Sequence, residues 1–466
     1  MNRLTPIIPQ MLDAAQVAQM HQGAVDVLED VGLLVQDDFV IGRLSEYPGV
    51  RVQGSRVHFA DWLVEEYVEQ HRAARLSATA GPPRNHIHLS AGCCASHVAD
   101  VVSGQIRPIT TEDLIDATKL IDALRDREIG GRVPGFPQDI PAALQALAEY
   151  KIGSQYSRRG GGFTAPCSLK GLEVIYEMHQ VMGQPFHLPL FVMNPLRIAG
   201  DSLETIRHFL DRADGFSSSS MPIMGGTAPI HFIGAFVQSI AESIGGYIVL
   251  KMLAPEKPAH FSVMAFCLDM RYGSITYGSP EQNLCDLIKI PVNAFYGSTD
   301  VSTRSIRTMA KRPGIQASAE KGASAVVGAL AGSRSFIGAG TLAVDEVFSP
   351  EQLVIDREIA DYAFRIAQGF RFDEEALSLD VIAECAETGE FLAHDSTLEN
   401  YRNVYWMPGL FEHSMLGRWR ELGEKDVLGE AHKVVQQALS NYDYELAPEK
   451  SRELDRLYDR ALEALA

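Results

Sequence analysis

The residues between 269 and 281 combine aromatic rings with small residues, a composition suited to binding a cation. Tyr272 and Tyr277 stand there among glycines and serines, ahead of Pro280 and Glu281. The face of a tyrosine ring attracts positive charge, so two such rings on one loop would enclose a cation. The alternative is an ordinary structured turn.

A second candidate is the run Tyr296–Asp300, where three small residues separate an aromatic ring from a carboxylate. The residues before it, 291–296, predict a strand. Barrel enzymes place functional groups where a strand ends and a loop begins. The alternative is an aspartate that caps the next helix.

A third candidate is the run Met224–His231, in which Gly225, Gly226 and Thr227 precede a long apolar segment that carries Glu242. Glycines allow a large ligand to approach the backbone closely. The alternative is a glycine loop that begins a helix, with Glu242 as a buried, hydrogen-bonded acid.

Strong catalytic signatures are missing from the sequence. It contains no P-loop, no GxSxG, no HExxH and no CxxC motif. The 14 histidines are dispersed without ligand spacing, which argues against zinc. The glycines at 160–162 precede a predicted strand, whereas a dinucleotide fingerprint follows one. We therefore expect neither a bound metal nor a nucleotide.

The elements that must position these residues alternate between strand and helix. Strands are predicted at 128–133, 161–165, 189–193, 215–219, 259–264, 291–296 and 335–338. Helices are predicted near 140–156, 168–182, 201–213, 229–253, 280–289, 314–331 and 350–368. Such alternation predicts a parallel sheet with crossover helices, and the count favours an α/β fold of the (β/α)8 TIM barrel type. The pattern does not define an eighth strand.

The remaining residues form additions on either side of this barrel. We expect an N-terminal helical and hairpin extension over 1–115, with a hairpin tip at 100–104 and a helix N-cap at Thr110. The barrel domain would span 116–370, and a C-terminal helical region packed on it would span 371–466. These additions would shape the mouth of the barrel and build contacts in a homo-oligomer.

Composition bounds the partners and the compartment. The chain of 466 residues has a net charge of −19, which argues against nucleic-acid and anionic-membrane partners because both require clustered positive charge. Its six cysteines are scattered, as expected in a reducing compartment, and no signal peptide is evident. The best membrane candidate, 231–254, is interrupted by polar residues and indicates a buried helix. We expect a cytoplasmic protein.

Taken together, several motifs resemble the trimethylamine methyltransferase family of corrinoid-dependent enzymes over nearly the whole chain. They are Leu28–Gly32, Met224–Pro229 with Glu242, Asp269–Arg271, Tyr277–Glu281, Gly297–Asp300, Ser349–Asp356 and Phe391–Leu398. The resemblance implies a TIM-barrel methyltransferase that moves a methyl group from a methylated amine to the Co(I) of a corrinoid protein. Only standard residues occur, so the chain looks like the branch without pyrrolysine, whose members use quaternary amines such as glycine betaine.

This chemistry makes few demands on the protein. A quaternary ammonium releases a neutral amine without needing a proton, so no acid–base pair and no metal is required. The protein must enclose the cation, anchor any carboxylate and align the methyl group with cobalt. The cobalamin would belong to a separate corrinoid protein, because this chain lacks the D-x-H-x-x-G pattern of cobalamin-carrying domains.

The resemblance also suggests roles for individual residues. The rings around the ammonium would come from Tyr272, Tyr277, Phe295 and Tyr296. The substrate carboxylate would be bound by Arg158, Arg159, Ser298 and Thr299. The groups counted as catalytic, which orient loops or offset the substrate's charge, would be Tyr296, Asp300 and Glu242. The corrinoid would be contacted by Gly225, Gly226, Thr227, Gly338 and His394.

Two other functions remain open at this point. A barrel methyltransferase with a pterin donor or acceptor would use Asp300 to hold the pterin ring. A non-catalytic protein that binds or senses betaine would share the absence of a catalytic signature.

Overall fold

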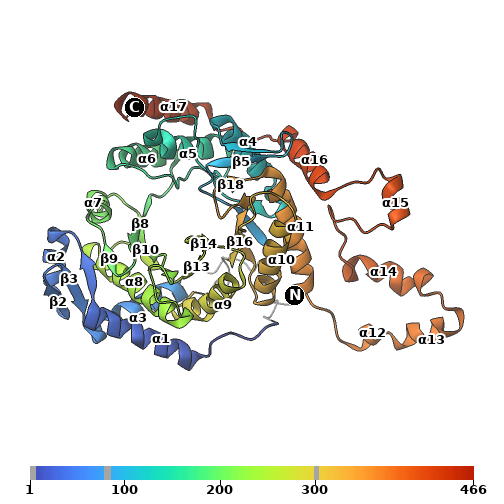
Figure 1. Cartoon of the computed structure of the whole chain (residues 1–466), viewed down its shortest axis with the longest axis horizontal. Helices are drawn as coiled ribbons and strands as arrows, with labels where there is room; N and C mark the ends of the chain where they lie inside the picture. The colour runs from blue at the N-terminus through green and yellow to red at the C-terminus, as the bar shows by residue number, and fades with distance from the viewer. Residues whose placement is uncertain (1–6, 78–85, 299–303, 466) are drawn as a thin grey trace.

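The computed structural model describes residues 7–77, 86–298 and 304–465. Strands and helices alternate through most of the chain, and Figure 1 shows the helices arranged as a ring around the strands. The strands of this ring are β4 (His88–Ala91), β7 (Ile129–Gly130), β8 (His187–Val192), β10 (Gly215–Ser220), β12 (Ala259–Phe261), β15 (Arg304–Ser305) and β16 (Ser335–Ala339). Its helices are α4 (Thr111–Ala123), α5 (Ala142–Tyr156), α6 (Leu169–Met182), α7 (Gly200–His208), α8 (Phe232–Leu253), α9 (Pro280–Phe295), α10 (Ile315–Leu330) and α11 (Pro350–Ala367).

These strands form two parallel sheets. One has the order β15-β16-β4-β7 and the other the order β12-β10-β8. The α/β class with parallel strands and crossover helices is therefore confirmed. Strand β4 pairs with both β16 and β7, so residues 88–91, which the sequence placed in the N-terminal extension, supply a strand that the pattern did not define.

The face of β8 that packs on helices differs sharply from its other face. Leu188, Leu190 and Val192 lie in the main apolar core, whereas the alternate residues of the strand are exposed, with Phe191 at 53%. The other face of β8 is therefore not packed against the apolar core.

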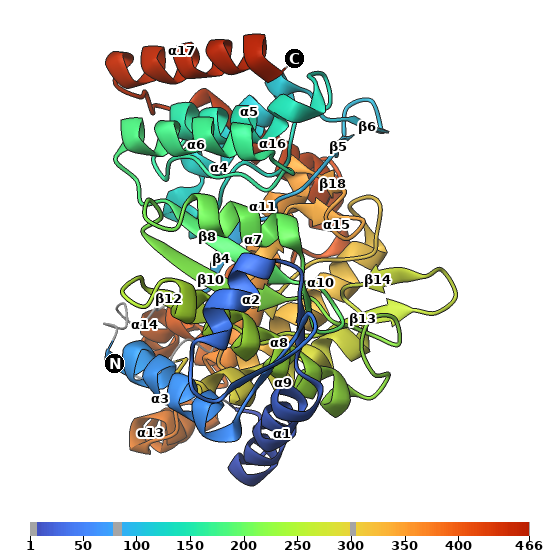
Figure 2. The same ribbon diagram turned by 90° about the vertical axis from the view of Figure 1, so that its left-hand side faces the viewer.

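Small sheets follow the C-terminal ends of the ring strands, and we call this end of the molecule, with its loops, the rim. One sheet contains β11 (Ile223–Met224), β13 (Phe266–Asp269) and β14 (Ser274–Thr276). The other contains β5 (His97–Asp100), β6 (Gln105–Pro108), β17 (Thr341–Leu342) and β18 (Val347–Phe348). Figure 2 shows the β5–β6 and β13–β14 hairpins on the same side of the molecule.

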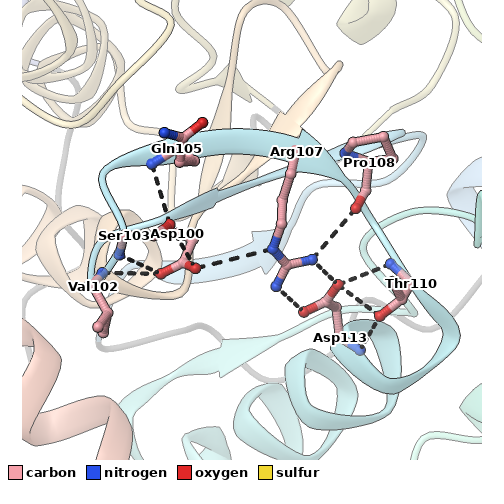
Figure 3. Close-up of polar contacts among 8 residues, drawn as sticks. All are labelled: Asp100, Val102, Ser103, Gln105, Arg107, Pro108, Thr110 and Asp113. Atoms are coloured by element: carbon pink, nitrogen blue, oxygen red, sulfur yellow. Dashed lines mark hydrogen bonds and ion pairs between the residues drawn. The ribbon is translucent and has the colours of Figure 1, made fainter.

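An arginine fixes the β5–β6 hairpin to the start of α4. The two Nη groups of Arg107 donate to the carboxylate of Asp113 at 2.6 and 2.7 Å, and its Nε lies 4.0 Å from Asp100 (Figure 3). Asp113 also accepts hydrogen bonds from the backbone N–H and the hydroxyl of Thr110, forming a capping box. The predicted hairpin tip and the predicted N-cap are both confirmed.

The N-terminal residues pack on the ring mainly against α8 and α9. They include α1 (Ala14–Asp26), α2 (Asp38–Ser45), α3 (Asp61–Ser77) and a sheet of order β2-β3-β1-β9, formed by β1 (Leu33–Val35), β2 (Val50–Gln53), β3 (Arg56–Phe59) and β9 (Arg197–Ile198). Among the described residues, α8 is the one helix long and apolar enough to cross a membrane, and most of it is buried inside the molecule.

The C-terminal residues first leave the ring and then return to it. Residues 370–422, which we call the arm, carry α12 (Glu374–Leu377), α13 (Leu379–Thr388), α14 (Asp395–Val404) and α15 (Leu416–Glu421), and project away from the ring (Figure 1). Helix α16 (Val427–Ser440) then packs on α11, and α17 (Pro448–Leu465) packs on α5 and α6.

Two predicted strands are wrong. Residues 291–296 are not a strand, because α9 continues through Pro291 to Phe295 and buries Cys285, Ile288 and Val292 at helical spacing. The strand that follows α9 is β15, of which the structure describes two residues, Arg304 and Ser305. Residues 161–165 form no strand either, because backbone N–H groups at this point bond to Glu149 instead of to a neighbouring strand.

Candidate active site

The rim brings a buried arginine together with residues from two separate loops and from the end of a strand. Arg307 follows β15, and its Nε donates to Oδ1 of Asp345 at 2.5 Å. Its guanidinium carbon lies 5.3 Å from the ring centre of Tyr277. Gly338, at the end of β16, has a φ of +87°, and a Cβ there would lie 2.5 Å from Cγ of Arg307. Glycine is therefore required beside this arginine.

The charge of Arg307 is maintained although the residue is only 9% exposed. Burial opposes the charge, but Asp345 and Tyr277 outweigh it and raise the pKa of Arg307 above its ordinary value. Asp345 occupies the Nε position, and among the residues that the structure describes no acceptor bonds to either Nη group. The arginine is thus held in place with its outer donor pair available for an anion.

Buried acids on the surrounding helices hold the rim loops. Glu149 on α5 accepts hydrogen bonds from the backbone N–H groups of Thr164, at 2.7 Å, and Ala165, at 3.1 Å, and from the Thr164 hydroxyl at 2.9 Å. Burial raises the pKa of Glu149 to about 7, against these hydrogen bonds. This acid takes the place of a strand partner for residues 164 and 165.

Glu242 on α8 has the same kind of role at the end of β8. It accepts hydrogen bonds from the Leu196 N–H at 2.8 Å, the Asn194 side chain at 2.5 Å and the Gln238 side chain at 2.9 Å. It is fully buried, and burial raises its pKa. Glu242 is therefore a buried, hydrogen-bonded acid that positions a loop, as the alternative interpretation of the sequence held.

A buried ion pair holds the loop that follows β16. Lys321 on α10 and Asp356 on α11 are fully buried, with Nζ and Oδ2 2.7 Å apart. Asp356 accepts the Gly340 N–H at 2.7 Å, and Lys321 donates to the Gly338 carbonyl at 3.3 Å. The pair thus fixes the backbone on which Arg307 rests.

Several residues selected from the sequence do lie at the rim. Tyr277 is buried against Arg307 and Phe266, and Gly338 packs on Arg307. Tyr272 lies at the tip of the β13–β14 hairpin and is 79% exposed. Three small residues form the exposed loop between β11 and α8, namely Gly225, Gly226 and Thr227.

The aromatic pair Phe295 and Tyr296 lies elsewhere, because it ends a helix rather than a strand. The Tyr296 hydroxyl is 2.9 Å from Nδ1 of His21, and the tyrosine is 2% exposed. The guanidinium of Arg72 lies 4.0 Å from the ring centre of Phe295. The cation on this pair thus belongs to the chain itself. Ser298 follows the same helix, and Thr299 and Asp300 lie outside the described residues.

The structure does not bring Arg158, Arg159 or His394 to the rim. Arg158 forms ion pairs with Asp122 and with Asp443, the latter at 2.6 Å. Arg158 and Arg159 come before residues 161–165 in the chain, whereas the rim loop at this point of the ring comes after those residues. His394 caps α14 on the arm, where its Nε2 lies 3.1 Å from Glu384.

Sequence reasoning missed Arg307, Asp345, Cys93 and Cys94. The adjacency of the two cysteines was the available signal for the thiols, which follow β4 at the rim. Arg307 gave no signal, because the strand before it has two residues and its partner is far along the chain. Within the described residues no three His, Cys, Asp or Glu side chains are grouped to hold a metal ion.

Comparisons with known proteins agree over the length of the chain. The profile of the trimethylamine methyltransferase (MTTB) family matches residues 2–464. Glycine betaine methyltransferase of Desulfitobacterium hafniense strain Y51 is 24% identical over 449 residues, covering 93% of this chain and 92% of that protein. Trimethylamine methyltransferase MttB of Methanosarcina thermophila is 30% identical over 259 residues, covering 55% of this chain and 53% of that protein.

Among solved structures, the monomethylamine methyltransferase MtmB of Methanosarcina barkeri aligns with a TM-score of 0.46 at 13% identity, over 98% of this chain and 93% of that one. The family match is the finding that assigns the chain, because it extends across both the ring and the additions. The chain belongs to the trimethylamine methyltransferase family.

Proposed function

We propose that this methyltransferase takes its methyl group from a quaternary amine that carries a carboxylate, with glycine betaine as the first substrate to test, and delivers it to the corrinoid of a partner protein. The observation that carries the proposal is Arg307, a buried and charged arginine at the rim with both Nη groups available. Glycine betaine methyltransferase, which aligns over 93% of this chain, supports the same substrate class.

Arg307 replaces the pair of arginines expected from the sequence as the carboxylate anchor. Its two Nη groups can bind a carboxylate through two parallel hydrogen bonds, while Asp345 keeps the guanidinium plane from turning. Tyr277 supplies the aromatic ring nearest to this anchor. A betaine anchored at Arg307 would present its ammonium and methyl groups toward the open side of the rim.

The exposed loops of the rim fit the approach of a large cofactor held by another protein. The Gly225–Thr227 loop is exposed and lacks bulky side chains. Large apolar side chains stand exposed around it, namely Met221, Ile230, Ile233, Met270 and Tyr272. When bound, a Co(I) corrinoid supplies the nucleophile that takes the methyl group and leaves a neutral amine. The chain's own residues bind the substrate, align it and exclude water.

We further propose that the two parallel sheets belong to one closed (β/α)8 barrel. The ring of alternating strands and helices supports it, as does the order β15-β16-β4-β7, in which β4 joins the last strands to the first. Because β4 then begins the barrel, the N-terminal addition would end before residue 88. The C-terminal addition would begin after α11.

A homo-oligomer in the cytoplasm completes the proposal. The arm exposes many large apolar side chains, a surface that a second copy of the chain would cover. All six cysteines carry free thiols, which supports a reducing compartment.

The decisive experiment mixes the protein with free Co(I) cobalamin and a panel of methylated amines, and follows conversion to methylcobalamin by absorbance. We expect conversion with glycine betaine and less with tetramethylammonium, which has the charge but no carboxylate. Betaine binding without methylation, even with a corrinoid protein supplied, would contradict the proposal and favour a binding protein. Methylation of a pterin instead would identify a different acceptor.

A further inference from the structure

Two pairs of cysteines have their sulfur atoms in contact, and their surroundings differ. The Sγ atoms of Cys93 and Cys94 lie 3.6 Å apart directly after β4. Those of Cys267 and Cys285 lie 3.7 Å apart in the core between β13 and α9. Cys267 and Cys285 are buried, whereas Cys93 and Cys94 are both half-buried. The pair at the rim is thus the one that a small reagent can reach.

The two rim thiols differ in how readily they lose a proton. The hydrogen bond with Cys93 holds the pKa of Cys94 below its ordinary value, at about 7, and the hydroxyl of Thr164 adds to this effect. The same hydrogen bond, together with burial, raises the pKa of Cys93. Cys94 is therefore the sulfur of the pair that ionises more readily, and a thiolate is the nucleophilic form of cysteine.

The backbone around the pair is held firmly. A Cβ at Gly92 would lie 1.8 Å from Cγ2 of Thr341, so the end of β4 is pressed against the loop after β16. Cys94 has a φ of +73°, a conformation that residues other than glycine rarely adopt. Arg307 and Asp345 act electrostatically on both sulfurs. The thiols thus belong to the rim, and no part of methyl transfer as proposed above uses them.

We propose that Cys93 and Cys94 form a redox-active vicinal dithiol at the rim, which a peroxide closes to a disulfide and a small dithiol reopens. The Cys94 thiolate attacks one oxygen of the peroxide, so that an S–O bond forms, the O–O bond breaks and hydroxide leaves. Cys93 then attacks the Cys94 sulfur, an S–S bond forms, and the oxygen leaves as water with the Cys93 proton. The two sulfurs lose two electrons in total, and the hydroxide takes up the proton that Cys94 released on ionising, so hydrogen peroxide becomes two molecules of water.

The test uses the full chain under anaerobic conditions and does not depend on the proposed methyl transfer. The reduced protein is treated with hydrogen peroxide at a one-to-one ratio, unfolded, alkylated with N-ethylmaleimide and analysed by mass spectrometry. Of the six cysteines, we expect two to escape alkylation. The tryptic peptide spanning residues 85–119, which contains Cys93 and Cys94 and in which Pro108 protects Arg107 from cleavage, should be two hydrogens lighter. It should carry two alkylated thiols after reduction with dithiothreitol and a second alkylation.

Variants separate the roles of the two sulfurs. Cys93→Ser should stop at a sulfenic acid on Cys94, which dimedone traps, and Cys94→Ser should react with peroxide about tenfold more slowly. The matched control Cys267→Ser breaks the buried pair and should leave oxidation at the rim unchanged. Six alkylated thiols after peroxide, a disulfide between Cys267 and Cys285, or a sulfinic acid on Cys94 with Cys93 still alkylated would each overturn the proposal.

Discussion

Arg307 donates its Nε–H to Asp345 across 2.5 Å, although the two residues are 38 positions apart in the chain. The contact joins the residue that follows β15 to the loop between β17 and β18. Because Asp345 binds the Nε–H, the plane of the guanidinium is fixed. The two Nη groups therefore keep their orientation without a second partner among the described residues. On the proposed function, this relationship is what would make the rim a site for a carboxylate.

Replacing Arg307 by lysine should weaken the binding of glycine betaine by about tenfold to a hundredfold, because a single ammonium cannot reproduce the two parallel hydrogen bonds. The binding of tetramethylammonium should change little. Isothermal titration calorimetry measures both. The matched control is Arg312→Lys, since Arg312 is exposed and donates a hydrogen bond to the Gly104 carbonyl at 2.5 Å. Equal losses for both ligands would contradict a carboxylate anchor.

Glu149 should make the stability of the protein fall as the pH rises from about 4.5 to about 7. Its pKa is about 7 in the folded protein against a model-peptide value of 4.5, so in this window the folded state binds more protons than the unfolded state. The free energy of unfolding therefore decreases with pH, by up to about 3 kcal/mol. Denaturant unfolding at several pH values measures the slope.

The control for this effect is Glu149→Gln, which keeps an acceptor for the Thr164 and Ala165 N–H groups but cannot ionise. The slope between pH 4.5 and 7 should become shallower in this variant. If the variant keeps the full slope of the parent, the titrating group is another residue.

The ring of helices was predictable because most of its helices are long and apolar residues recur throughout them. The strands are two to six residues long, too short for alternation to define their ends. The error at 291–296 has this cause. A short apolar run with a proline resembles a strand as much as the last turns of a helix, and the apolar face of α9 shows itself only in the folded protein.

The site was predictable where the local backbone demands a small residue. Position 338 at the rim requires glycine because no side chain fits there beside Arg307. The Gly225–Thr227 loop is where the chain turns from β11 to α8. Arg307 and Asp345 had no local signature, because their pairing exists only once β15 and β16 lie side by side. The predicted position of Phe295 and Tyr296 was wrong because it depended on a strand at 291–296, where α9 continues instead.

Lys321 and Asp356 should be among the most sensitive positions for stability. Replacing Lys321 by methionine leaves the Asp356 carboxylate buried without its partner, at an expected loss of about 3–5 kcal/mol. The double variant Lys321→Met, Asp356→Asn should recover part of this loss, because a neutral amide oxygen can still accept the Gly340 N–H. Denaturant unfolding of the parent, both single variants and the double variant forms a complete cycle. A double variant no more stable than Lys321→Met would contradict this account.

The arm should form a contact between copies of this chain. Cys385 is the one buried residue within its described helices. Large side chains are exposed along its length, including Phe370, Phe372, Leu379, Leu392, Tyr405 and Met415. Side chains of this kind present on the order of 1,000 Å² of apolar surface, enough for the ~800 Å² that each partner of a stable dimer buries. Short helices without a core of their own need such a cover.

Sedimentation velocity should therefore show the parent protein as a dimer or larger assembly. The double variant Leu392→Glu, Met415→Glu places charges on two arm residues that are 85% and 84% exposed, and it should dissociate to monomers with unchanged circular dichroism. The matched control is Ile315→Glu, at a position on α10 that is 93% exposed but lies outside the arm. A monomeric parent would assign the apolar arm to a different partner, such as the corrinoid protein. A control that dissociates as readily as the arm variant would contradict a contact made by the arm.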